Sequence, residues 1–363
     1  MLFTIGATIN EPIYNHLAGV LLGTAIGDAL GLYMEGLSAK TISASFANGI
    51  NRYYLLGNIG FVSDDTEQSA LVAQSLVRYP HDSDGATQAF KVAMLGWFSR
   101  LPFGVGRATS QSCLKMLTGA KETGIRSAGN GAAMRAAVIG VFYHDNQEYR
   151  LKIGKSIACT THLDQRAIDG ALFVAELAAA AYSNRNSQDP NRRLQSFDSA
   201  IGIVQETSLR AALDSARNLA GQAATIEAAA QELGCSGFVN HSVTLAAFAF
   251  LRWGDDTLAA LQWTIKAGGD TDSNAAIVGA WCGALLGEQG LPANLIDKIN
   301  DGPFGPSHLR QLACALGDIK FGKTSATPTY FWPTALVRNL VLIPIILGHT
   351  LKRLILVSSK TNR

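Results

Sequence analysis

Glycine recurs at every fourth position of an apolar segment near the start of the chain, and this spacing restricts how the chain can fold. The glycines are Gly19, Gly23, Gly27 and Gly31, and residues 17 to 34 carry a single charged side chain, Asp28. Residues four apart in a helix share one face, so the spacing predicts a helix with a flat face on which a second helix can lie close. A membrane-spanning helix is the competing interpretation, but Asp28 would lie far into the span, where a charge is costly. We therefore expect a buried packing helix.

The composition agrees with closely packed helices. Hydrophobic residues make up 48% of the 363-residue chain, charged residues only 16%, and there are 36 glycines. No stretch shows the sustained alternation of polar and apolar residues that is typical of strands. We therefore expect an all-α fold, a multi-helix bundle with a substantial core. The net charge of +2 gives no reason to expect a nucleic-acid partner.

The cysteines and the first residues bear on the compartment. The five cysteines are odd in number, lie far apart and include no CxxC pair, which argues against both a zinc site and a disulfide framework. The first ten residues lack the basic start and cleavage site of a secretory signal. We therefore expect a cytoplasmic protein. The cysteines are Cys113, Cys159, Cys235, Cys282 and Cys314.

Two acids and a hydroxyl open an apolar run late in the chain. Asp270, Asp272 and Ser273 precede a series of small and apolar residues that reads as a buried helix. Their oxygen atoms are the ligands that Mg²⁺, Mn²⁺ or Ca²⁺ prefer. A simple helix start is the alternative, because Asp and Ser are good N-caps and acids are favoured in a first turn. Capping needs one such side chain, however, and this segment offers three.

A second acidic segment repeats the pattern. Ser63, Asp64 and Asp65 also open a helix. Adjacent carboxylates repel one another in a desolvated site unless a proton or a cation neutralises them. The two segments together offer four carboxylates and two hydroxyls, enough for two Mg²⁺ or Mn²⁺ ions that share ligands.

Two glycine loops are candidate anion sites. Gly104 and Gly106 lie in the segment 103–109, where backbone amides can approach a phosphate closely. The segment Ser127–Gly131 precedes an apolar run, 132–142, that we expect to be helical, so its free N–H groups and the helix dipole would favour a diphosphate. The alternative for this loop is an Asn-Gly turn that caps a core helix.

Five short motifs occur in the order that is typical of one family. They are Gly23–Gly31 with Glu35 shortly after, Ser63–Thr66, Ser127–Arg135, Thr161–His162 and Gly269–Asn274. Over roughly residues 15 to 320 the chain resembles the ADP-ribosylglycohydrolase family, which includes ADP-ribosylhydrolases. The resemblance implies a compact orthogonal helix bundle and a hydrolase that removes ADP-ribose from a protein side chain or a small acceptor.

The resemblance also implies roles for individual residues. Glu35, Asp65 and Asp270 are the expected catalytic residues, one of which would take a proton from the attacking water. The expected ligands of two Mg²⁺ or Mn²⁺ ions are Ser63, Asp64, Asp65, Asp270, Asp272 and Ser273. The expected substrate-binding residues are Gly104, Gly106, Ser127, Gly129, Asn130, Gly131, Met134 and His162. A lone histidine such as His162 is more often structural than catalytic, so we assign it to binding.

The acceptor and the class of function have alternatives. Some arginine-directed relatives carry an acid near the first glycine loop, and this chain has none between Arg100 and Lys121. The expected substrate is an ADP-ribosylated protein or an ADP-ribose-containing small molecule, with arginine and serine both open as the acceptor. An all-α isoprenoid synthase also binds Mg²⁺ through aspartate pairs, but the glycine loop near residue 129 has no purpose there. A relative that binds ADP-ribose without catalysis would not need a full two-metal set.

The C-terminal segment is set apart by its composition. We expect a catalytic domain over residues 1–323 and an apolar, basic helical extension over 324–363. The uninterrupted apolar run, Leu340 to Gly348, is too short to span a bilayer. Residues 330–357 can form an interfacial helix at a membrane surface, or a helix docked on the core or on a second protein.

Overall fold

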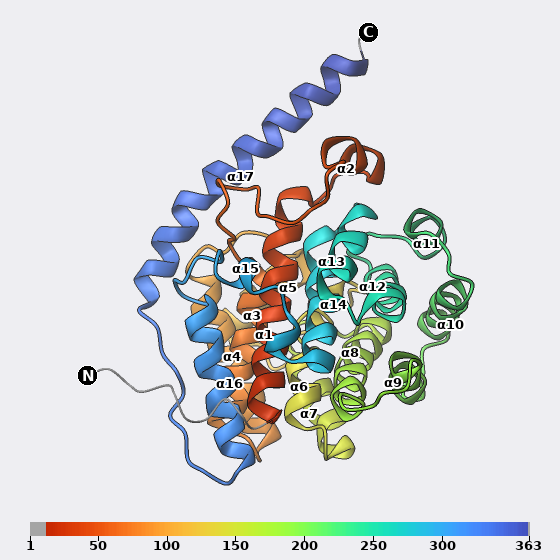
Figure 1. Cartoon of the computed structure of the whole chain (residues 1–363). Helices are drawn as coiled ribbons and strands as arrows, with labels where there is room; N and C mark the ends of the chain where they lie inside the picture. Colours follow the sequence, from red (N-terminus) through yellow and green to blue (C-terminus); the bar gives the residue numbers. More distant parts are fainter. Residues whose placement is uncertain (1–11, 362–363) are drawn as a thin grey trace.

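Two apolar helices lie antiparallel at the centre of the fold. The computed structural model describes residues 12–361, and their side chains from 13 to 349. Helix α1 (Pro12–Gly31) packs along α14 (Thr271–Leu286) (Figure 1). A Cβ atom added at Gly23 would lie 2.1 Å from the carbonyl oxygen of Gly279, so glycine is required for this approach. The flat helix face predicted from the glycine spacing is thus used, and it is buried against α14.

The remaining helices surround this pair. In the described residues we find isolated β-bridges but no β-strand, so the all-α prediction is confirmed. The helices around α1 and α14 are α2 (Ala39–Ser45), α3 (Asp64–Arg78), α4 (Ser83–Phe98), α5 (Arg107–Leu117), α6 (Ala137–Phe142), α7 (Gln147–Cys159), α8 (Gln165–Ser183), α9 (Arg192–Ile201), α10 (Thr207–Gly221), α11 (Ile226–Leu233), α12 (Val239–Trp253), α13 (Thr257–Lys266), α15 (Ala293–Ile296), α16 (Pro306–Lys320) and α17 (Trp332–Thr361). Three short 3₁₀ turns, η1 (Leu32–Met34), η2 (Asn130–Ala132) and η3 (Glu288–Gly290), complete the described elements.

One expected helix is shorter than its apolar pattern indicates. The run 132–142 was expected to be helical throughout, but η2 ends at Ala132 and α6 begins only at Ala137. The loop is held by tertiary contacts instead, because the Asn130 N–H donates to the Gly237 carbonyl at 3.0 Å. A tertiary hydrogen bond here outweighs local helix propensity.

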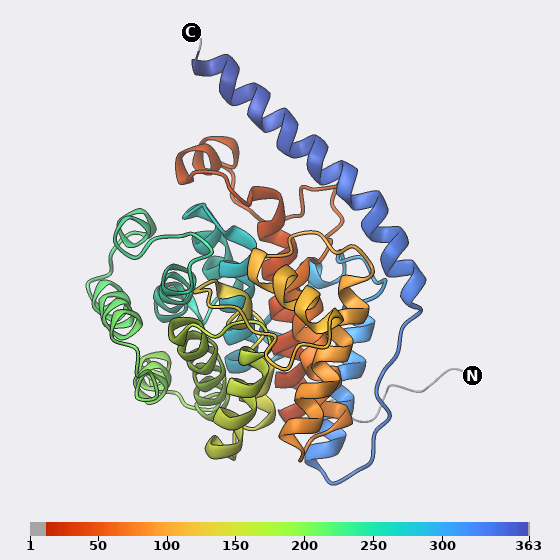
Figure 2. The same ribbon diagram turned by 180° about the vertical axis from the view of Figure 1, so that it is seen from behind.

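The last helix leaves the body of the protein along its length. The first half of α17 packs on the core, where Ala335, Asn339 and Leu342 are buried. Its C-terminal half extends past the rest of the fold in both views (Figures 1 and 2). Two described helices are long and apolar enough to cross a membrane: Ile13–Met34, whose most apolar window is 94% buried in the protein, and Trp332–His349, for which this share is 17%. The predicted domain boundary at residue 323 stays a prediction.

Candidate functional site

Asp28 fixes the start of α3. Its carboxylate accepts hydrogen bonds from the Ser63 N–H at 2.8 Å, the Ser63 hydroxyl at 2.7 Å and the Thr66 N–H at 3.2 Å, and another from the Thr66 hydroxyl. Burial raises the pKa of Asp28 to about 6, although the hydrogen bonds from Thr66 and Ser63 act in the opposite direction. This role of Asp28 was not predicted from the sequence. The only signal was an acid inside an otherwise apolar helix.

Asp65 joins the starts of α3 and α14. Its Oδ2 atom accepts a hydrogen bond from the Ser273 hydroxyl at 3.2 Å, across 208 positions of sequence. Its Oδ1 atom is buried and has no hydrogen-bond partner among the described residues. Burial raises the pKa of the Asp65 carboxyl well above its usual range, and the charges of Asp28 and Asp270 raise it further. The two acidic segments therefore converge, as the sequence predicts.

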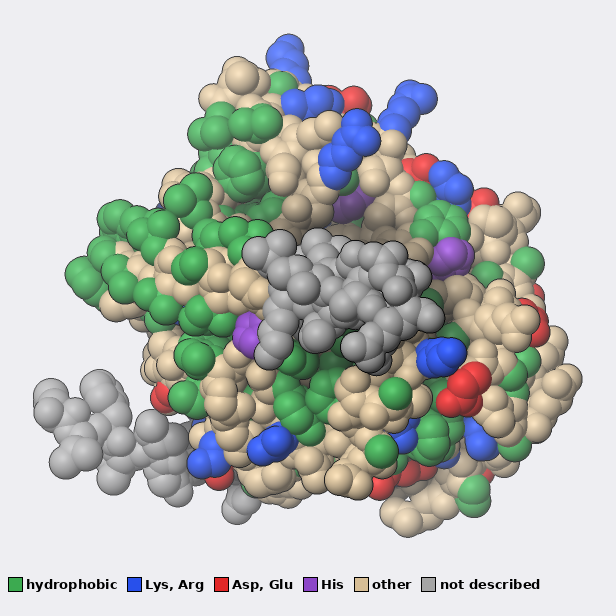
Figure 3. Space-filling view, turned by 90° about the horizontal axis from the view of Figure 1, so that it is seen from above, with side chains coloured by type: hydrophobic (Ala, Val, Ile, Leu, Met, Phe, Trp, Pro, Cys, Tyr) green, Lys and Arg blue, Asp and Glu red, His purple; other side chains and the backbone are tan. Residues whose placement is uncertain are grey.

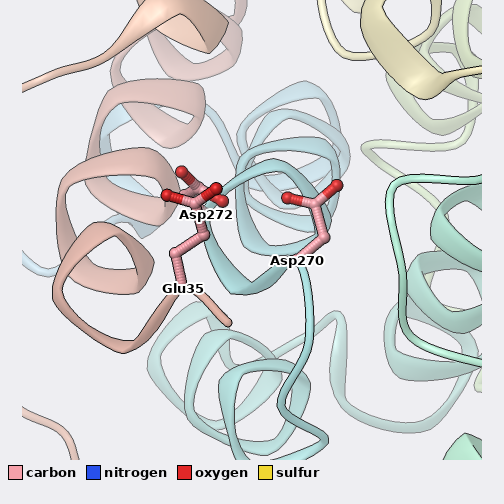
Figure 4. Close-up of side chains that lie close together, drawn as sticks. All are labelled: Glu35, Asp270 and Asp272. Atoms are coloured by element: carbon pink, nitrogen blue, oxygen red, sulfur yellow. The ribbon is translucent and has the colours of Figure 1, made fainter. Parts of the chain in front are cut away.

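Three further carboxylates face one another beside this contact. Oxygen atoms of Glu35, Asp270 and Asp272 lie within 4.8 Å of one another, with Glu35 exposed and Asp272 buried (Figure 4). The Gly36 N–H donates to the Gly269 carbonyl at 2.7 Å, which holds the Glu35 segment against the start of α14. Burial raises the pKa of Asp272 well above its usual range, and the neighbouring charges of Glu35 and Asp270 add to the shift.

Asp64 meets the first glycine loop. A Cβ atom at Gly104 would lie 2.7 Å from the Asp64 Oδ1 atom, and the Gly104 φ of 78° favours glycine as well. The Gln68 side-chain amide donates to the Asp64 Oδ2 atom at 3.2 Å. Burial raises the pKa of Asp64, and the charge of Asp65 raises it further. The predicted glycine loop thus approaches one carboxylate of the acidic cluster, which comprises Asp28, Glu35, Asp64, Asp65, Asp270 and Asp272.

A cavity of about 500 Å³ opens above the carboxylates. Ser63 and Asp65 are buried and do not line it, whereas all other predicted site residues do. Arg107, at the start of α5, adds a basic side chain to the lining that the sequence analysis did not select. The predicted residues in the lining are Glu35, Asp64, Gly104, Gly106, Ser127, Gly129, Asn130, Gly131, Met134, His162, Asp270, Asp272 and Ser273.

The second glycine loop is tied to the acidic cluster by Asn130. Its side-chain amide donates to the Asp270 Oδ2 atom at 2.6 Å and fixes the orientation of this carboxylate. The expectation of free N–H groups in this loop is wrong for three residues. The Ser127 N–H donates to the Ile125 carbonyl, the Gly129 N–H to the Ser127 hydroxyl oxygen and the Asn130 N–H to the Gly237 carbonyl. The expected dipole contribution is also weakened, since α6 starts only at Ala137.

A buried arginine connects the loop, α3 and the histidine. Arg135 donates to the Gln68 Oε1 atom at 2.7 Å, to the Gly131 carbonyl at 2.9 Å and to the Thr161 hydroxyl oxygen at 2.6 Å. The Thr161 hydroxyl in turn lies 2.8 Å from the His162 Nδ1 atom. Burial, with a smaller contribution from Arg135, lowers the pKa of His162 to about 3. The low pKa favours a neutral imidazole near pH 7. The ring lies beside the second glycine loop, since a Cβ atom at Gly131 would lie 3.1 Å from the His162 Cε1 atom. Its expected role in substrate binding stays a prediction.

The acidic cluster has the composition of a divalent-cation site. Among the described residues, Asp28, Asp64, Asp65 and Asp272 are buried and form no ion pair with lysine or arginine. Buried carboxylates without a counter-charge have raised pKa values, and a bound cation would offset this repulsion. Every donor is an oxygen atom, which suits Mg²⁺ or Mn²⁺. The unpartnered Oδ1 atom of Asp65 is available for such an ion.

The fold and the site define a helical protein with an acidic, oxygen-rich cavity, and comparisons with known proteins identify the family. The ADP-ribosylglycohydrolase family profile matches residues 10–324. An uncharacterized protein of Archaeoglobus fulgidus is 30% identical over 317 residues, covering 82% of this chain and 95% of that protein. The ADP-ribosyl-[dinitrogen reductase] glycohydrolase of Rhodospirillum rubrum is 23% identical over 297 residues, covering 79% and 91%.

A solved structure of a protein from the same family also resembles this chain. An ADP-ribosylglycohydrolase-related protein complex superposes with a TM-score of 0.64 at 25% identity, covering 84% of this chain and 97% of that chain. The chain belongs to the ADP-ribosylglycohydrolase family. It is accordingly a hydrolase that acts on glycosidic bonds, and the family match ends before α17.

Proposed function

We propose that this protein is a metal-dependent hydrolase that cleaves the glycosidic bond between ADP-ribose and an arginine or serine side chain, or a small acceptor. Two Mg²⁺ or Mn²⁺ ions would be its cofactors. The observation that carries the proposal is the convergence of both acidic segments on one cavity, with the buried Oδ1 atom of Asp65 left unpartnered. Family membership supports action on ADP-ribose compounds.

The residues that would hold the ions are Ser63, Asp64, Asp65, Asp270, Asp272 and Ser273. Bound there, Mg²⁺ or Mn²⁺ would lower the pKa of a water molecule and offset the carboxylate repulsion. Glu35 or Asp270 would accept a proton from the attacking water, and Asn130 would keep the Asp270 carboxylate oriented through its 2.6 Å hydrogen bond. The carboxylates around the cavity would stabilise the positive charge that develops on the ribose ring.

The glycine loops and Arg107 line the same cavity as the carboxylates. Gly104 and Gly106 leave room for a close approach of substrate, and the Arg107 guanidinium would pair with a diphosphate. The name of the Rhodospirillum rubrum relative describes an ADP-ribosylated protein as its substrate, which supports a protein acceptor here. We further propose a cytoplasmic location, a proposal that the five free cysteines support.

The test is release of ADP-ribose from arginine-linked and serine-linked ADP-ribosyl peptides, with Mg²⁺, with Mn²⁺ and with a chelator. Asp64→Asn and Asp270→Asn should abolish release and should remove the rise in melting temperature that Mn²⁺ causes in the parent protein. Asp84→Asn is the matched control, because Asp84 is an exposed acid in the first turn of α4. Parent-like release by either site variant would contradict the ligand assignment.

The same assay separates the alternative functions. Binding of ADP-ribose without release from either peptide would favour a non-catalytic binder or a small-molecule substrate. Release in the presence of the chelator would show that the acids act without a metal. Membership of the glycohydrolase family sets aside the isoprenoid synthase hypothesis.

A further inference from the structure

Two polar side chains in the first half of α17, Arg338 and Asn339, face the core of the protein. Arg338 forms an ion pair with Glu67, which is buried in the first turn of α3 and also accepts a hydrogen bond from the Trp97 indole N–H. The Asn339 side chain donates to the Arg100 carbonyl at 2.9 Å. One turn further on, Leu342 is buried in a small apolar cluster. These contacts attach the first half of α17 firmly to the catalytic domain.

The opposite face of α17 is apolar and exposed. Val337 is 60% exposed, Leu340 53% and Leu347 63%, at a spacing of three to seven residues that places them on one side of the helix. Figure 3 shows hydrophobic side chains gathered on the surface that this helix forms at the left of the view. A surface helix of a water-soluble domain has the reverse arrangement, with apolar residues inward and polar residues outward. The exposed apolar residues at the start of the helix and along this face are Phe331, Trp332, Val337, Leu340, Val341, Pro344 and Leu347.

The charge of this region has one sign. No aspartate or glutamate follows Asp318 in the sequence. The basic residues after it are Lys320, Lys323, Arg338, Lys352, Arg353, Lys360 and Arg363. Arg338, Lys320 and Lys323 form ion pairs with Glu67, Asp145 and Asp318. The uncompensated positive charge of the sequence after Asp318 therefore comes from Lys352, Arg353, Lys360 and Arg363. Aromatic and aliphatic residues on one face, combined with basic residues, are typical of helices that lie at an anionic membrane surface.

We propose that the outward face of α17 docks on a membrane surface that contains anionic phospholipids. The helix would lie in the interface rather than cross the bilayer, because Arg338 and Asn339 are fixed on the core and the apolar run after them, Leu340 to Gly348, is too short to span. A second copy of the chain is a weaker candidate for this face, since two helices with the same positive charge repel one another. The surface lies outside the family-matched region, so it is an addition to the hydrolase.

The test measures sedimentation of the full chain with vesicles of phosphatidylcholine alone and of phosphatidylcholine mixed with phosphatidylglycerol. The protein should bind the mixed vesicles, and salt should weaken binding because the charge interaction is screened. Burying one leucine side chain changes partitioning by about tenfold or more, so Leu340→Gln with Leu347→Gln should lower the partition coefficient on the order of 100-fold. Lys352→Gln with Arg353→Gln should lower it by about 30-fold.

Matched controls use exposed apolar residues elsewhere. Val92 on α4 and Leu114 on α5 are 58% and 55% exposed, so Val92→Gln and Leu114→Gln remove similar apolar surface away from α17. These variants should bind vesicles as the parent does. Because Leu340 and Leu347 are solvent-exposed, their glutamine variants should retain the parent's melting temperature and its hydrolase activity in solution.

Two results would overturn the proposal. One is absence of binding to the anionic vesicles at low salt, or equal binding by the parent and the Leu340/Leu347 double variant. The other is a dimer in light scattering that the double variant dissociates, because the face would then be covered by a second copy of the chain. Neither result would affect the proposed hydrolysis, which is measured on peptides without lipid.

Discussion

The contact between α1 and α14 leaves no room for a side chain at Gly23, and Gly23→Ala tests this directly. The added Cβ atom would lie 2.1 Å from the Gly279 carbonyl oxygen and 2.7 Å from its carbonyl carbon. Carbon and oxygen atoms in close contact across helices are normally about 3.3 Å apart, so the helices would have to separate by about 1.2 Å. Both obstructing atoms are backbone, so no rotamer change relieves the clash.

The expected cost is large for one methyl group. Overpacking a core costs about 1–3 kcal/mol and sometimes more. If α1 and α14 move apart to relieve the clash, a gap of 0.5–1 Å between them removes about a quarter to a half of the dispersion energy of each contact along the helix pair. Alanine regains only about 1 kcal/mol of helix propensity over glycine. We therefore expect Gly23→Ala to lower the free energy of unfolding by about 3 kcal/mol or more, measured by denaturant titration followed by circular dichroism.

Gly96→Ala is the control that isolates the contact from the change in propensity. Gly96 lies in α4, is exposed, and a Cβ atom there would have no neighbour within 4 Å. This variant should be more stable than the parent by about 0.5–1 kcal/mol. The two substitutions, identical in chemistry, should therefore differ in sign. If Gly23→Ala unfolded at the parent's denaturant concentration, the close approach of α1 and α14 would be refuted.

Three further predictions concern buried charges. Glu67→Gln and Arg338→Met should each destabilise the protein by about 3–5 kcal/mol, because each change leaves the other member of the ion pair buried without its partner. The double variant should lose less stability than the sum of the two single variants. A double-mutant cycle measures this difference as the coupling energy of the pair. Burial lowers the pKa of His308 from 6.5 to about 4 in the folded protein. Between these two pH values the unfolded state binds a proton that the folded state does not. The free energy of unfolding should therefore fall by about 3 kcal/mol as the pH drops from 6.5 to 4. His308→Gln should flatten that slope in pH-dependent denaturation, whereas the exposed His81→Gln should not. Mn²⁺ should raise the melting temperature of the parent in thermal-shift assays, and Asp65→Asn should lose most of this rise; an unchanged rise would remove Asp65 from the proposed ligands.

Local patterns predicted the parts of this molecule that depend on neighbours in sequence. The four-residue glycine spacing indicated a close helix contact, and hydroxyl-acid groups before apolar runs indicated the starts of α3 and α14. The pairing of α1 with α14 was not predicted, although Gly279 and Gly283 repeat the spacing, because sequence spacing does not say which two faces meet. Family resemblance supplied the grouping of the acidic segments with the glycine loops, and the cavity lining agrees with it.

The parts that were missed depend on tertiary contacts. Asp28 caps the first turn of α3 from another helix, and Arg135 reaches Gln68 and Thr161 only in the folded chain. The run 132–142 has a helical pattern, but the bonds from Asn130 to Gly237 and Asp270 keep its first residues out of α6. In each case a polar side chain or amide finds a distant partner, and sequence periodicity carries no information about such partners.

The packing of α1 on α14 also sets the geometry of the acidic site. The Thr271 hydroxyl donates to the Gly31 carbonyl at 2.9 Å, and a Cβ atom at Gly31 would lie 2.4 Å from the Thr271 carbonyl oxygen. Asp28 lies one turn before Gly31, while Thr271 is flanked by Asp270 and Asp272. The helices are therefore in backbone contact at the point where their carboxylates gather. A bulkier interface would move these acids apart, so the glycine spacing that determines the fold also brings the proposed metal ligands within reach of one another.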